Sequence, residues 1–190
     1  MMRAPRTNCG FGMIEVLIAL VILLVSALGL AGIAVRMTQQ ETESYQRVQA
    51  LILLQDMVDR MNANRKVVSC YSNGAIGITL GSGFSGAIPS CAAGNAAQDA
   101  QVASDLADWN NLLKGASQQT STSSNSGAVI GARGCVVQVD PAQKTYRVTV
   151  AWQGLGKTVA PNSACGQNSY GDEALRRTVN AIVQIGNLSS

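Results

Sequence analysis

The first 36 residues of the chain divide into a short polar opening and one long apolar run. Residues 1–10 contain two arginines and no acidic residue, whereas Met13–Val35 contains a single charged side chain, Glu15. About 20 consecutive apolar residues are enough to span a bilayer as a helix. The pattern therefore predicts a membrane-spanning helix that begins close to the N-terminus.

Beyond Arg36 the sequence becomes amphipathic, with apolar residues three or four positions apart at Val48, Leu51, Leu54, Val58 and Met61. This spacing predicts one apolar face on a helix that continues to Asn64. The pairs Glu43–Arg47 and Asp56–Arg60 have the i,i+4 spacing that supports the exposed side of a helix. One helix from Phe11 to Asn64 would be roughly 80 Å long at 1.5 Å per residue.

The rest of the chain predicts a small α+β region. A short amphipathic helix is expected from Val102 to Leu113, with Trp109 as a core residue. Alternating apolar residues predict a hairpin of Cys135–Val139 and Thr145–Gln153 and a last strand near Leu175–Ile185. We predict that Ser72–Asn95 and Gln118–Gly127, rich in Gly, Ser and Thr, are loops.

Composition and charge exclude several classes of function. Histidine is absent, which excludes His-based triads and His-containing metal sites. Without Arg3 and Arg6, 12 basic residues face 11 acidic ones, so electrostatics give no support for nucleic-acid binding. The Gly81–Gly86 segment fits G-x-G-x-x-G, but no helix is expected to follow it, and we expect no cofactor.

A catalytic group is also hard to find in this sequence. The best candidates are three polar residues on one predicted helix, Asp105, Asp108 and Lys114, and we interpret them as a solvated face. A membrane-anchored periplasmic enzyme and a ligand-binding adhesin domain stay open as alternatives, although the chain is not expected to be an enzyme.

Five cysteines are present, and none forms a C-x-x-C pair. Four of them lie beyond the apolar run, a pattern that suits two disulfides in an oxidising compartment, and four buried thiols in a cytosolic domain are the alternative. Four cysteines allow three pairings. We predict Cys70–Cys91 and Cys135–Cys165, because each pair brackets one loop-rich segment and neighbouring cysteines close the shortest loops.

Two interpretations of the N-terminal segment need to be separated. A cleavable secretory signal has an apolar core of only about 7–15 residues before a small-residue site, and Gly29-Leu30-Ala31 could serve as one. Glu15 is the unusual residue, because a carboxylate in a membrane helix costs roughly 2.5–3.5 kcal/mol near the bilayer centre. It either has a partner or lies close enough to the interface to reach water.

The combination of Gly10-Phe11, Glu15, a basic leader and an unbroken apolar helix resembles the signal of type IV prepilins. The resemblance implies that prepilin peptidase, a membrane aspartyl peptidase, cuts between Gly10 and Phe11 and methylates the new N-terminus at Phe11. It also implies that Glu15 pairs with the N-terminal amine of a neighbouring subunit during assembly.

The helix as a whole is similar to that of the PilV-type minor pilins, the type IV pilus modification proteins. The similar features are the Gly29–Gly32 patch, the Gln49-Ala50 region and the helix end Asp59–Asn64. This likeness implies the type IV pilin fold, with residues 1–10 as leader, 11–36 as membrane and filament-core helix, 37–64 as its amphipathic continuation and 65–190 as a globular α+β domain. A type II secretion pseudopilin shares the leader and helix and is the alternative.

A minor pilin of this kind contributes to pilus assembly and priming, twitching motility and cell adhesion. The implied partners are other major and minor pilins, prepilin peptidase and the inner-membrane assembly platform. The implied location is the inner membrane, with a periplasmic C-terminal domain, and the extracellular pilus after assembly. In pilins the C-terminal disulfide bounds a surface loop, which the resemblance places at Cys135–Cys165.

Overall fold

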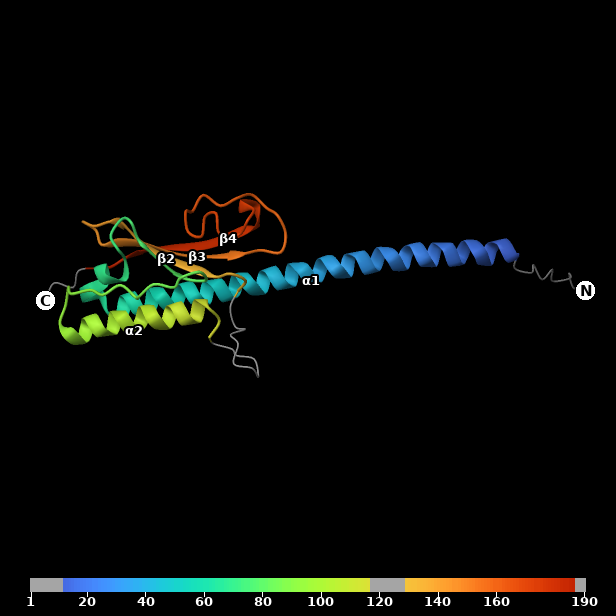
Figure 1. Cartoon of the computed structure of the whole chain (residues 1–190). Helices are drawn as coiled ribbons and strands as arrows, with labels where there is room; N and C mark the ends of the chain where they lie inside the picture. Colours follow the sequence, from blue (N-terminus) through green and yellow to red (C-terminus); the bar gives the residue numbers. More distant parts are fainter. Residues whose placement is uncertain (1–11, 117–128, 187–190) are drawn as a thin grey trace, which may run out of the picture. The chain divides into compact units, whose positions relative to one another are not determined.

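A computed structural model describes residues 12–116 and 129–186 of the chain (Figure 1). The helices are α1 (Met13–Ala63) and α2 (Ala96–Leu113), and short 3-10 turns cover Arg65–Tyr71 and Glu173–Leu175. The strands are β1 (Ile78–Gly81), β2 (Arg133–Asp140), β3 (Thr145–Gln153) and β4 (Arg176–Gln184). The chain divides into two compact units, Met1–Thr42 and Glu43–Ser190.

The described part of the first unit is the N-terminal stretch of α1. Among the described residues, α1 is the helix that is long and apolar enough to cross a membrane, judged by length and composition. Its large apolar side chains from Met13 to Val35 are 51–87% exposed, and the helix runs without a break through Gly29 and Gly32. A contiguous apolar surface of this kind needs lipid or other apolar chains to cover it.

The second unit is an antiparallel sheet packed on helices, which confirms the predicted α+β class. Its strands lie in the order β1-β2-β3-β4, and each pairs antiparallel with the next (Figure 1). Asp140 accepts hydrogen bonds from the backbone N–H groups of Ala142 and Gln143 and so stabilises the β2–β3 turn. The strand β1 lies inside a segment predicted to be loop, so that prediction was wrong for Ile78–Gly81.

The core lies between the sheet and the two helices. The inward side chains of β3 are fully buried as predicted, and they pack with residues of α1 and α2: Tyr146, Val148, Val150, Trp152, Leu54, Met57, Leu106 and Trp109. Asn95 begins α2 with a capping box, in which its side chain accepts from the N–H of Gln98 and the Gln98 side chain accepts from the N–H of Asn95.

The buried face of α1 differs from the predicted one. Val48 and Leu51 are 51% and 46% exposed, and the buried positions are Gln46, Ala50, Leu53, Leu54, Met57 and Met61. Both sets have spacings of three and four residues, so periodicity alone could not choose between two adjacent apolar stripes. Of the predicted ion pairs, Asp56–Arg60 is present at 2.8 Å, whereas Glu43 contacts Arg177.

Trp109 fixes the distance between α2 and the sheet. Its indole N–H donates to the Leu53 carbonyl of α1 at 2.8 Å, and its ring lies directly over Gly134 of β2. A Cβ on Gly134 would lie 2.2 Å from the ring atom Cη2. Glycine is therefore required here because the ring, hydrogen-bonded to α1, has no room to move away.

We expect Gly134→Ala to lower the free energy of unfolding of the second unit by about 1–3 kcal/mol, the usual cost of overpacking a core. The measurement is urea denaturation of the full-length protein in detergent, followed by tryptophan fluorescence. Gly86→Ala is the matched control, because its added methyl would meet only the Phe84 ring at 3.5 Å. Equal stability of the two variants would contradict this account of the core.

Candidate functional site

Glu15 lies in the first turn of α1, where its N–H donates to the Gly12 carbonyl at 2.9 Å. Gly10 and Phe11, the predicted cleavage and methylation residues, lie outside the described residues. Apolar side chains on both sides of Glu15, including Ile14 and Leu17, are exposed. Within the described parts of the chain its carboxylate has no ion-pair partner.

Two disulfides join distant parts of the second unit. Cys70 is bonded to Cys91 with the two Cα atoms 5.5 Å apart, which links the end of the 3-10 turn after α1 to the segment that precedes α2. Cys135 of β2 is bonded to Cys165 with a Cα–Cα distance of 5.9 Å. The second bond links the sheet to the loop that connects β3 with β4.

This connecting loop, residues 154–172, covers part of the sheet face opposite the helices. Cys135, Ala151, Cys165 and Tyr170 form a second small buried cluster there. The Tyr170 hydroxyl donates to the Gly131 carbonyl at 3.0 Å, and burial raises the pKa of Tyr170 to about 12, so the phenol stays protonated at neutral pH. The loop is therefore packed by side chains as well as tied by the disulfide.

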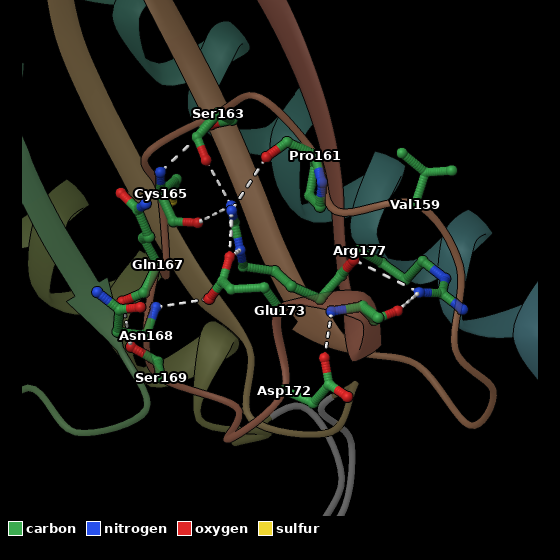
Figure 2. A network of polar contacts seen from close by, with 12 residues as sticks. Val159, Pro161, Ser163, Cys165, Gln167, Asn168, Ser169, Asp172, Glu173 and Arg177 are labelled. Carbon is green, nitrogen blue, oxygen red and sulfur yellow. Dashed lines mark hydrogen bonds and ion pairs between the residues drawn. The ribbon is translucent and has the colours of Figure 1, made fainter.

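Arg176, at the start of β4, binds several backbone carbonyls of the loop, and its partners Pro161, Ser163 and Cys165 are labelled in Figure 2. Its side chain is only 2% exposed. One terminal nitrogen donates to the carbonyls of Ser163 and Cys165, and the other donates to the Pro161 carbonyl at 3.0 Å. The Nε atom donates to the Glu173 carboxylate at 2.7 Å. A planar guanidinium suits this position because it presents several fixed donors at once.

Two carboxylates, those of Asp172 and Glu173, accept hydrogen bonds where the loop joins β4. Glu173 accepts from the Asn168 N–H at 2.6 Å and from Arg176, and these contacts, the backbone one first, hold the pKa of Glu173 below its usual value. Asp172 accepts from Lys157 at 2.7 Å and from the Ala174 N–H, which lowers the pKa of Asp172. The loop contacts are therefore complete at neutral pH and weaken as the pH falls through the pKa values of these carboxyl groups.

Arg177 and Glu43 link the loop to α1. Arg177 donates to the Gly156 carbonyl at 2.6 Å and to Glu43 at 3.4 Å. Glu43 also accepts from the backbone N–H groups of Leu155 and Gly156. Glu43 and Arg177 thereby hold the first part of the loop, and Val159, shown in Figure 2, is 90% exposed.

The remaining charged cluster surrounds Asp105 and differs from the prediction. Asp105 is buried, where it accepts from Arg60 at 3.1 Å, from Gln101 at 2.9 Å and from the Tyr71 hydroxyl. Burial, followed by the bond to Asp105, raises the pKa of Tyr71. Asp108 is exposed as predicted, but Asp105 is not part of a solvated face. Because these groups satisfy one another, the cluster supports packing and offers no free acid, base or nucleophile.

One group of potential metal ligands occurs among the described residues, and it does not fit a metal ion. It consists of Cys70, Cys91 and Asp99, but both sulfur atoms are used in the disulfide. A thiolate is needed for metal binding, so only one carboxylate remains.

Sequence reasoning missed the role of Arg176 and Arg177. The available signal was the order Asp172-Glu173 followed by Arg176-Arg177 at the beginning of a strand with no other charge. Which carbonyls each arginine meets depends on the path of the loop, and no periodic pattern determines that path.

Comparisons with known proteins give one match. Residues 5–31 match the family described as the prokaryotic N-terminal methylation motif. No curated protein and no solved structure matches the chain. The match covers the N-terminal segment that includes Gly10, Phe11 and Glu15 and does not extend into the second unit.

We expect Arg176→Lys to destabilise the protein by about 3 kcal/mol, because an ammonium group cannot reach all four acceptors and leaves buried carbonyls unpaired. Hydrogen exchange of the full-length protein should show faster exchange in residues 161–168 than elsewhere in the second unit. Arg147→Lys is the matched control, since Arg147 is exposed on β3 and has no ion pair among the described residues. Unchanged exchange in Arg176→Lys would contradict the role given to this guanidinium.

Proposed function

We propose that this chain, whose N-terminus has the leader motif shared by type IV pilins and pseudopilins, is a minor pilin of a type IV pilus. The strongest support is that the matched motif and the exposed apolar part of α1 occupy the same part of the sequence. The matched motif, residues 5–31, overlaps the stretch of α1 whose apolar side chains are exposed and whose one charge is Glu15. A leader motif on a helix that needs an apolar environment is what an assembling, membrane-anchored subunit requires.

In this proposal the chain is organised as a leader (1–10), a membrane and filament-core helix (11–36), its amphipathic continuation (37–64) and a globular domain (65–190). Prepilin peptidase cuts after Gly10 and methylates Phe11. The amine of one subunit then pairs with Glu15 of another, which neutralises two charges that are costly in an apolar filament core. The pairs Cys70–Cys91 and Cys135–Cys165 form in the oxidising periplasm before the subunit enters the extracellular pilus.

The similarity of the helix to PilV-type minor pilins supports a role in assembly and priming of the pilus, and through it in twitching motility and adhesion. The partners are then other pilins and the inner-membrane assembly platform. The alternative within the same class is a type II secretion pseudopilin. The genes next to this one separate the two, because pilus and secretion systems are encoded with different machinery.

The proposal predicts a specific mature N-terminus. Because cleavage follows Gly10, the intact mass of the membrane-extracted protein should equal that of residues 11–190 with two disulfides and one methyl group on Phe11. Cys9 should be absent. A mature protein that begins at Gly32 would show that an ordinary signal peptidase had acted, and the pilin function would be wrong.

Glu15→Ala should leave cleavage and membrane insertion intact, since an apolar residue at this position avoids desolvation of a carboxylate. Incorporation into filaments should fail, because the amine of the neighbouring subunit loses its partner in an apolar groove at a cost of several kcal/mol, about 3–5 for a broken buried pair. Glu15→Gln should behave almost as badly, because it keeps the shape and loses the charge.

The measurement compares the abundance of each variant in sheared filaments with its abundance in membranes. Glu41→Ala is the matched control, because Glu41 is an exposed residue of the same helix outside the apolar run. Incorporation of Glu15→Ala at the level of this control would mean that Glu15 only reaches water at the interface.

A further inference from the structure

The two outer strands of the sheet are protected to different extents. β1 has four residues, and its outward N–H at Gly81 donates to the Asn110 side chain of α2 at 2.9 Å. β4 has nine residues, and within residues 12–116 and 129–186 its one partner strand is β3. An unpaired outer strand presents a row of backbone donors and acceptors that can pair with another chain.

Backbone contacts at both ends of β4 determine which of its groups are unpaired. Gly154 donates to the Leu175 carbonyl, and Ile185 donates to the Lys144 carbonyl, each across the β3–β4 pair. Antiparallel pairing alternates, so the odd-numbered residues of β4 bond to β3. The even-numbered residues Thr178, Asn180, Ile182 and Gln184 turn their N–H and C=O groups outward, and these groups have no backbone partner among the described residues.

The loop that covers the start of β4 ends where this free edge begins. The Thr158 N–H donates to the Ala174 carbonyl, and the Arg177 side chain donates to the Gly156 carbonyl at 2.6 Å. Beyond Arg177 the strand continues as Thr178–Gln184, which contains no charged residue and no proline. Charged residues and prolines are common on outer strands, where they prevent pairing with other chains.

The side chains of the free edge are also incompletely covered. Ala181 and Val183 face the core but are only partly buried against it. Ile182, on the opposite face, is 63% exposed. A further strand laid along β4 would cover all three, provided that it places apolar side chains next to Ala181 and Val183.

We propose that Thr178–Gln184 of β4 accepts an extended strand, apolar on alternate residues, from a different subunit of the same assembly. This inference rests on the proposed function, because it takes the chain to be a subunit of a filament. The backbone of the incoming strand pairs with the four outward-facing residues, and its apolar side extends the core beyond Ala181 and Val183.

A second copy of the chain is the less suitable partner. β4 begins beside Glu43, to which Arg177 is bound, and runs in the same direction as the Glu43–Ala63 part of α1 (Figure 1). Two copies could pair through β4 and keep their helices on the same side of the joined sheet. Their two β4 strands would then run antiparallel. The two Glu43 residues, at which the second unit of each copy begins, would then lie at opposite ends of the joined sheet.

Hydrogen exchange with single-residue resolution tests the inference on the full-length protein. In detergent, the odd-numbered amides of β4 should exchange slowly and the even-numbered ones quickly. In sheared filaments the amides of Asn180 and Ile182 should slow by about tenfold or more, the factor that corresponds to about 1.4 kcal/mol, as expected for a new backbone hydrogen bond. Unchanged exchange of these two amides in filaments would overturn the inference.

Raising the protein concentration in detergent tests for self-pairing. Even-numbered amides that become protected in the concentrated pure protein would show that a second copy occupies the edge, and the inference would be wrong. If the subunit is anchored in membranes but absent from filaments, both the proposed function and this inference fail. If it is present with unprotected even-numbered amides, only the inference fails.

A pair of variants at Asn180 provides the second test. Asn180→Pro and Asn180→Ala both remove an exposed amide side chain, but only proline removes the outward N–H, and proline is tolerated on an outer strand at such a position. The filament-to-membrane ratio of the proline variant should fall about tenfold below that of the alanine variant. Slow exchange of the odd-numbered amides verifies that β4 is intact, and equal ratios with β4 intact would overturn the inference.

Discussion

One unbroken helix, α1 (Met13–Ala63), contains both an exposed apolar part and a part that packs under the sheet. Up to Val35 its apolar side chains have no cover among the described residues, whereas from Gln46 to Met61 one stripe of side chains is buried under the sheet. The buried stripe fixes which side of the second part of the helix faces the sheet. Because one hydrogen-bonded helix contains both parts, the globular domain is attached to its apolar anchor without a linker sequence.

A four-stranded sheet has two faces, and the helices α1 and α2 pack against one of them. Part of the second face is covered by the loop between β3 and β4, and Arg176 and the Cys135–Cys165 bond hold the loop there. The guanidinium satisfies carbonyls that would otherwise be buried without partners, and the disulfide reduces the freedom of the unfolded loop. The guanidinium contacts stabilise the folded state, whereas the disulfide lowers the entropy of the unfolded state, so neither replaces the other.

The sequence predicted the elements whose signal is periodic and local. The predicted inward residues of β3 (Tyr146, Val148, Val150 and Trp152) and of α2 (Val102, Leu106, Trp109 and Leu113) are buried as expected. Prediction was wrong where two stripes compete, as at Val48 and Leu51, and where tertiary contact decides, as at β1 and Asp105. Of the candidate site, the leader motif is a local pattern and was recognisable from sequence. The contacts of Arg176 depend on a loop path that no short-range rule determines.

The two edges of the sheet suggest how a subunit of an assembly differs from an independent soluble domain. For a freely diffusing protein, an uncharged outer strand such as Thr178–Gln184 increases the risk of aggregation, because any exposed strand in any orientation can pair with it. In the membrane-anchored subunit that we propose, the copies of this chain would not diffuse freely, so chance pairing of one β4 with another would be less frequent. Under the proposed function, the charges and prolines that protect other outer strands would then be less necessary on β4, and its backbone groups would remain available to a strand of another subunit.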